Sequence, residues 1–171
     1  SFTGEEEMTS IYQRASAYHQ DRFSIIEDMY HQCRELICQK HASVMDWLKH
    51  LPYYYENDHQ IFVHAGIEVI DYQPELWKQV STVNTYLMKY PASQGQFYKK
   101  VIAGHIGTHQ VSGQSDFHRI CCLGDFIYLD SSVITTQFLN VLQYDCQTCR
   151  YQGLIKKNQQ WQTYDIAHFN K

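Results

Sequence analysis

The sequence predicts an α+β protein, with helices in the first third of the chain and mainly short strands after residue 52. Residues 21–51 carry apolar side chains at helical spacing, whereas short apolar runs bounded by turn residues dominate from Arg119 onward. Two further apolar runs, 61–63 and 101–103, are each followed closely by a histidine. The 171 residues are 44% hydrophobic and 19% charged, which is typical of a globular domain with a real core.

The helical region is predicted to present one broad apolar face. Its members are Leu36, Ile37, Val44, Trp47, Leu48 and Leu51. A break is expected near residues 40–43, and Pro52 should end the last helix. Residues 1–20 begin with an acidic, polar stretch and are predicted to be a loop or a cut end.

The remainder, residues 52–171, is predicted to be mainly β with one helical connection around residues 75–90. Two hairpins stand out, one with its turn at residues 56–59 and one turning at Gly124-Asp125. The expected strands are 53–55, 60–63, 97–103, 119–123, 126–130, 138–144, 151–155 and 161–164, the last two forming a final hairpin around Lys157-Asn158.

His64 and His105 are the candidate metal ligands. Each stands where a short apolar strand leaves its sheet: Ala65 and Gly66 follow His64 in Val63-His64-Ala65-Gly66, and Gly104 precedes His105 in Ala103-Gly104-His105. In layered α/β folds, ligands bind just beyond the carboxyl ends of strands. Two imidazoles delivered there by rigid strands can therefore share one metal ion.

The six cysteines favour a reducing, cytoplasmic setting over a disulfide framework, because a chain of this length can form a core that does not need disulfide bonds for stability. Cys121 and Cys122 are adjacent and should point to opposite faces of one strand. Cys146 and Cys149 form a lone C-x-x-C after a strand, interpreted as turn cysteines of unassigned role. The pair Cys33 and Cys38, with His41 nearby, is interpreted as packing positions. A small zinc module built on these cysteines remains the alternative.

Net charge and hydropathy argue against two classes of partner, nucleic acids and membranes. The net charge of −4 disfavours nucleic acid. No apolar run approaches the roughly 20 residues of a membrane span, and no signal peptide opens the chain, so a cytoplasmic protein without a membrane partner is expected.

The histidine motifs also carry a resemblance. Leu51-Pro52-Tyr53-Tyr54-Tyr55 leads into Ile61-Phe62-Val63-His64-Ala65-Gly66-Ile67, and Val101-Ile102-Ala103-Gly104-His105 with Thr108 follows. This pattern resembles the second half of calcineurin-like metallophosphoesterases, above all bacterial serine/threonine protein phosphatases of the PPP type and their diadenosine tetraphosphatase relatives. Phe126 to Asp130 resembles the family's strand that ends in Asp, and Phe138 to Tyr144 the strand after it. The similarity spans about Leu51 to Tyr144.

The resemblance implies a metallophosphoesterase-type β-sandwich flanked by helices, of which residues 1–171 form the C-terminal part of a single domain. It implies hydrolysis of phosphate monoesters by two divalent metal ions (Mn, Fe or Zn) that activate water for in-line attack on phosphorus. His64 and His105 would both bind the second metal. The expected substrates are phosphoserine or phosphothreonine proteins or small phosphate esters, with dinucleoside polyphosphates as an alternative.

Other family motifs are absent from the sequence. The absent motifs, which would precede residue 1, are Asp-x-His, Gly-Asp-x-x-Asp-Arg-Gly and Gly-Asn-His-Glu. In the family they supply the general acid and a phosphate-binding arginine. No catalytic residue is therefore assigned here. Lys89 stands near where a further arginine is expected, but an ammonium cannot replace the bidentate guanidinium. Some relatives carry a Gly-His-x-His motif, but Gly107 stands here at the position of its second histidine. His109 is therefore interpreted as lying behind the site or on the surface. Asp130 is interpreted as structural.

A second class of function stays open. The same fold could serve as a non-catalytic binding or assembly domain, since no bridging carboxylate can be assigned. Lacking its first strands, the domain should expose a sheet edge and apolar surface, and self-associate or need a partner segment.

Overall fold

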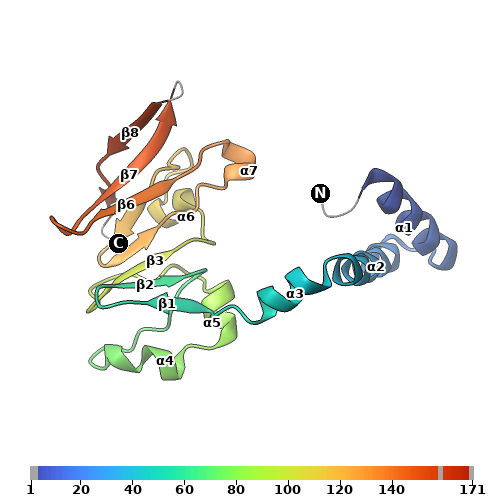
Figure 1. Ribbon diagram of the computed structural model, residues 1–171, viewed down its shortest axis with the longest axis horizontal. Coiled ribbons are helices and arrows are strands. Elements are labelled where there is room, and N and C mark those ends of the chain that lie inside the picture. Colours follow the sequence, from blue (N-terminus) through green and yellow to red (C-terminus); the bar gives the residue numbers. More distant parts are fainter. Residues whose placement is uncertain (1–3, 158–159, 170–171) are drawn as a thin grey trace. The chain divides into compact units, whose positions relative to one another are not determined.

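The computed structural model describes residues 4–157 and 160–169 and divides into two compact units, Ser1–Leu51 and Pro52–Lys171. The first unit is helical, and the second holds both β-sheets and further short helices (Figure 1). The α+β class predicted from the sequence is confirmed. The boundary falls at the Leu51–Pro52 step, where proline was expected to end the helical region.

The first unit contains helices α1 (Glu5–Tyr18), α2 (Arg22–Lys40) and α3 (Ala42–Lys49). The prediction of a loop or cut end over residues 1–20 was therefore wrong for α1. Three glutamates in its first turn favour the helix through its dipole, and the Glu7 carboxylate accepts a hydrogen bond from the Gly4 N–H at 3.2 Å. Asp21 caps α2 by accepting from the Ser24 N–H at 2.9 Å. The expected break between α2 and α3 is confirmed at His41.

Helices α1 and α2 pack through a small apolar contact that buries Ile11 and Ala15 completely. Lys40 forms an ion pair with Glu7, and the Cys33 thiol lies 3.6 Å from the Met8 sulfur. The predicted apolar face of α2 and α3 does not become a core. No residue of these two helices is buried, and Trp47 is 61% exposed.

The second unit is built on a six-stranded sheet in the order β1-β2-β3-β5-β4-β9. Strands β2 (Gln60–Val63), β3 (Lys100–Ala103) and β5 (Phe126–Tyr128) run parallel to one another. Strand β1 (Tyr54–Glu56) pairs antiparallel with β2, and β4 (Cys121–Leu123) pairs antiparallel with β5 across the predicted Gly124-Asp125 turn. Strand β9 (Ala167–His168) was not predicted.

A second sheet of three antiparallel strands covers part of one face of the first. It consists of β6 (Val141–Asp145), β7 (Arg150–Lys157) and β8 (Gln160–Tyr164). Leu142, Tyr151 and Tyr164 from this sheet pack against a core of Ile102, Ile120, Cys122 and Ile127. Cys121 belongs instead to the core on the opposite face, so the two adjacent cysteines do point to opposite sides of β4, as predicted.

The opposite face of the large sheet carries the main core, covered by the helical connection. One helix was predicted around 75–90, but the structure has η1 (Pro74–Leu76), α4 (Trp77–Val80) and α5 (Val83–Met88). The break occurs because Thr82 starts a new helix, its hydroxyl accepting from the Thr85 N–H at 3.2 Å. Trp77 is fully buried, and its ring meets Tyr54 edge-on at 4.8 Å between centroids.

Several boundaries differ from the sequence prediction. Residues 97–99 and 138–140 lie outside β3 and β6, and the short helices α6 (Thr108–Ser112) and α7 (Val133–Thr136) were missed. The Ser131 hydroxyl donates to the Phe138 carbonyl, which ties residue 138 to the loop around α7 in place of a strand. Strands β7 and β8 pair as expected; Asn158 of their predicted turn lies outside the described residues.

Strand β1 forms one edge of the large sheet, and apolar side chains near it remain exposed. Tyr55 is 62% and Phe62 37% exposed, with their rings 6.0 Å apart. Self-association through such an edge, expected from the sequence, stays a prediction. Among the described residues, no helix has both the length and the apolar character required to cross a membrane.

Candidate metal centre

The two candidate ligands follow neighbouring parallel strands at the same edge of the large sheet. Val63 at the end of β2 is in register with Ala103 at the end of β3, so both chains leave the sheet at one level. The Gly104 N–H donates to the His64 carbonyl at 2.8 Å, which continues the pairing one step beyond the strands. Parallel pairing therefore places both histidines at the carboxyl edge, as the sequence predicted.

The imidazole rings of His64 and His105 converge. Their centroids lie 5.1 Å apart with an angle of 58° between the ring planes. His64 is exposed and His105 half-buried, so a solute can reach the pair. Two imidazoles at this separation are able to bind a shared divalent ion of the Mn, Fe or Zn type.

The backbone at His105 is held in an uncommon conformation. Its φ is 62°, in the left-handed region that costs a non-glycine residue about 1–2 kcal/mol. The adjoining turn is tight, because the Ile106 N–H donates to the Gly104 carbonyl two residues earlier, at 2.7 Å. Strained residues of this kind persist where surrounding contacts over-determine them, often at functional sites. The turn directs the His105 ring toward His64.

The loop after His105 is anchored to the end of β5. Thr108 is fully buried, and its N–H donates to the Asp130 carbonyl at 2.7 Å. The Asp130 carboxylate accepts from the Ser132 N–H at 2.7 Å, closing a turn in which Ser132 has a φ of 56°. These contacts agree with the structural role expected of Asp130.

The donor set is incomplete in the described part of the chain. Within residues 4–157 and 160–169, no group of three or more His, Cys, Asp or Glu side chains can hold a metal ion. Two imidazoles suit a borderline divalent ion chemically, but they fill only two of its four to six coordination positions. Among the described residues, the structure therefore provides two converging imidazoles without a third donor of these types.

Lys89 does not supply a free cation beside the pair. Its ammonium binds the Glu68 carboxylate at 2.5 Å, and its aliphatic stem packs on Gly66, where an added Cβ would lie 2.9 Å from the lysine Cγ. Glu68 thus neutralises the one residue considered as a substitute for the missing phosphate-binding arginine.

His109 lies in α6 beside a residue that the sequence did not single out. Its ring centroid is 6.0 Å from that of His118 in an edge-to-face arrangement. Both residues are half-buried, and the Nδ1 atom of each is buried without a hydrogen-bond partner among the described residues. His118 carries no motif that would have marked it in the sequence.

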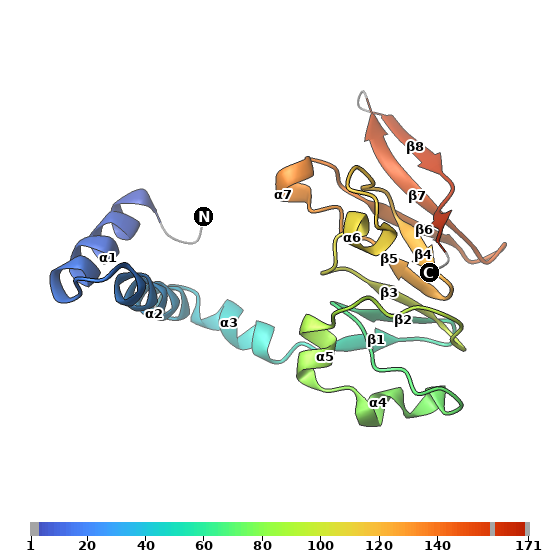
Figure 2. The same ribbon diagram turned by 180° about the vertical axis from the view of Figure 1, so that it is seen from behind.

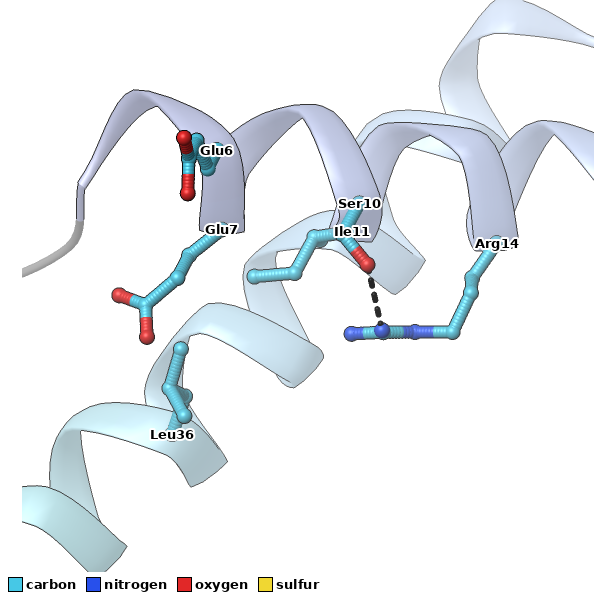
Figure 3. A pocket seen from close by; sticks show the side chains of 6 residues that line it. All are labelled: Glu6, Glu7, Ser10, Ile11, Arg14 and Leu36. Carbon is cyan, nitrogen blue, oxygen red and sulfur yellow. Dashed lines mark hydrogen bonds between the residues drawn. The ribbon is translucent and has the colours of Figure 1, made fainter.

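Two of the cavities, one in each unit, are lined by neither His64 nor His105. One of about 290 Å³ belongs to the helical unit and is lined by Glu6, Glu7, Ser10, Ile11 and Arg14 of α1 and by Leu36 of α2 (Figure 3). Its Arg14 guanidinium donates to the Ser10 hydroxyl at 2.9 Å. The other, of about 370 Å³ in the second unit, is lined by Lys100, Cys122, Ile127, Tyr151, Asp165, Ile166 and His168.

Comparison with known proteins adds no relative: no protein-family model, curated protein or solved structure matches this chain.

Proposed function

We propose that this chain contributes His64 and His105 to a metal centre that hydrolyses phosphate esters, with phosphoserine or phosphothreonine proteins as the substrate class. The observation that carries the proposal is the convergence of the two rings to 5.1 Å at the carboxyl edge of parallel strands. The resemblance of both histidine motifs to calcineurin-like metallophosphoesterases supports the choice of reaction. Dinucleoside polyphosphates are the alternative substrate on the same chemistry.

The histidines would act as neutral ligands, and protons would compete with the metal for their ring nitrogens. When bound, a divalent ion supplies a Lewis acid for the phosphoryl oxygens and lowers the pKa of its water. The protein holds the two rings in place through the Gly104–His64 backbone hydrogen bond and the tight turn at His105. The carboxylate ligands of such a centre have to come from residues other than the described ones.

The test combines hydrolysis and metal content. Residues 1–171 are assayed with p-nitrophenyl phosphate and added Mn²⁺, beside His64→Ala, His105→Ala and the double variant, with bound metal measured on the same samples. His59→Ala, which removes an exposed histidine before β2, is the matched control. Metal that is retained by the control and lost in all three variants supports the site. Equal metal in every sample contradicts it.

The second candidate is a non-catalytic binding or assembly domain. It is favoured by the two-ligand donor set and by the pairing of Lys89 with Glu68, which leaves no assigned group to bind a phosphoryl oxygen. The test of this candidate supplies the acidic family motifs on a separate polypeptide. If metal binding depends on the histidines but Mn²⁺-dependent hydrolysis is absent with and without that polypeptide, the binding or assembly function is favoured over the enzyme.

A further inference from the structure

The C-x-x-C of this chain occupies the tip of the β6–β7 hairpin. Asp145 at the end of β6 pairs with Arg150 at the start of β7, so the loop between them is Cys146, Gln147, Thr148 and Cys149. The turn projects from the unit in both views (Figures 1 and 2). Both cysteines are free and exposed.

The hairpin keeps the two cysteines close along the backbone. Cys146 directly follows Asp145, and Cys149 directly precedes Arg150, the residue that pairs with Asp145. The Cα atoms of paired residues in an antiparallel hairpin lie about 4.5–5.5 Å apart, so the chain on each side of the loop starts within the roughly 4.4–6.8 Å that disulfide-bonded cysteines span.

Hydrogen bonds hold this turn in shape. The Asp145 carboxylate accepts from the N–H groups of Gln147 and Thr148, at 2.8 and 3.3 Å. Cys149 has a φ of 56° and closes the loop in the left-handed conformation. The thiols are therefore presented by a preformed turn, which reduces the conformational entropy lost when they are linked.

Tyr144 interacts electrostatically with the cysteine at the far end of the loop. Its ring lies 4.6 Å from that of Tyr151, and a hydrogen bond with the Cys149 side chain raises the pKa of Tyr144 to about 12. Among the described cysteines, Cys121 and Cys122 are buried and have no such exposure.

The hairpin tip lies at the opposite end of the strands from the histidine pair. The Tyr151 hydroxyl accepts from the Gln60 side chain at 2.7 Å, and Gln60 begins the strand that ends before His64. At about 3.3 Å per residue, Gln60 and His64 are separated by roughly 13 Å along the strand direction. The thiol pair is therefore a separate site.

From this geometry we infer that Cys146 and Cys149 form a thiol–disulfide exchange site for small-molecule disulfides such as glutathione disulfide. One cysteine thiolate attacks the small disulfide, releases one glutathione thiolate and becomes a mixed disulfide. The second cysteine thiolate attacks the protein sulfur of that mixed disulfide and releases the other glutathione thiolate. The two protons from the cysteines pass to the released thiolates, and the two electrons lost by the protein reduce the small disulfide.

The test equilibrates the 171-residue chain anaerobically with glutathione and glutathione disulfide, blocks free thiols with N-ethylmaleimide, and analyses peptides by mass spectrometry. We expect a Cys146–Cys149 disulfide that exceeds the mixed disulfide by about tenfold or more at millimolar glutathione, because the neighbouring thiol acts at a high effective concentration. Cys33 and Cys38 are the internal control, since residues five apart on α2 face different sides and cannot close.

Single variants make the result decisive. Cys146→Ser and Cys149→Ser should each trap the remaining cysteine as a glutathione mixed disulfide. Wild-type protein that accumulates mixed disulfide to the same extent as these variants, or that keeps both thiols, would overturn the inference. A Zn²⁺-bridged dimer in native mass spectra that both serine variants abolish would also overturn it, because it would assign the pair to a metal site.

Discussion

The left-handed backbone at His105 offers a test of whether the turn is held under strain to direct the imidazole. His105→Gly and His105→Ala both remove the ring, but only glycine adopts a φ of 62° without steric cost. Relief of the strained φ should stabilise the glycine variant by about 1–2 kcal/mol relative to the alanine variant. The larger conformational entropy of glycine in the unfolded state should destabilise it by about 0.5–1 kcal/mol. Without metal, His105→Gly should therefore be more stable than His105→Ala by about 0.5–1 kcal/mol.

Urea unfolding without metal, followed by near-ultraviolet circular dichroism from buried aromatic residues such as Trp77 and Tyr128, measures this difference. The matched control is His59→Gly against His59→Ala, at an exposed position where φ is not positive. There the order should reverse or vanish. An alanine variant at 105 that equals or exceeds the glycine variant in stability would refute strain at this turn.

Three further predictions concern the frame around the site. Gly124→Ala should lower the free energy of unfolding in urea by more than about 2 kcal/mol, because φ at this position is 68° and the new Cβ would lie 2.1 Å from the Gly95 carbonyl oxygen. Gly113→Ala is the control: its φ is 76° but the space around it is open, so it should cost only about 1 kcal/mol. Equal losses in the two variants would contradict this prediction. Trp77→Ala should cost about 3–5 kcal/mol by the same measurement, with a loss under 1 kcal/mol as the contrary result. Burial raises the pKa of the Cys122 thiol to about 11, whereas the reference pKa of an unfolded cysteine is 9.0. The folded state therefore holds this proton more tightly than the unfolded state. The free energy of unfolding should fall as the pH rises from about 9 to about 11. Urea midpoints across that range should decline less in Cys122→Ala, and an identical decline would contradict the assignment.

The parts of the fold that sequence predicted well are those where local chemistry and burial agree. Gly124-Asp125 marks a tight turn, and the apolar runs beside it form β4 and β5. The histidines after β2 and β3 could be located because strand ends in parallel sheets share an edge. The left-handed turn at His105, which accompanies the convergence of the two rings, carries no signal in the sequence.

The parts that failed depend on contacts that a linear pattern does not display. Helix α1 buries only Ile11 and Ala15, so its apolar signal is weak and its charged first turn resembled a loop. The helix expected at 75–90 breaks where Thr82 caps a new one. The salt bridge between Lys89 and Glu68 and the neighbouring rings of His109 and His118 join residues distant in sequence, and no motif announces either.

The most direct test of the central claim is a metal-binding cycle on His64 and His105. Co²⁺ or Mn²⁺ affinity is measured by calorimetric titration of the wild type, both alanine variants and the double variant. If both rings bind one ion, each single variant should lose at least about 10–100-fold in affinity, the loss already typical of removing an outer-shell partner. The double variant should then lose little more, because the shared site is already broken. Unchanged affinity in either single variant, or losses that add independently, would contradict a shared metal site at these strand ends.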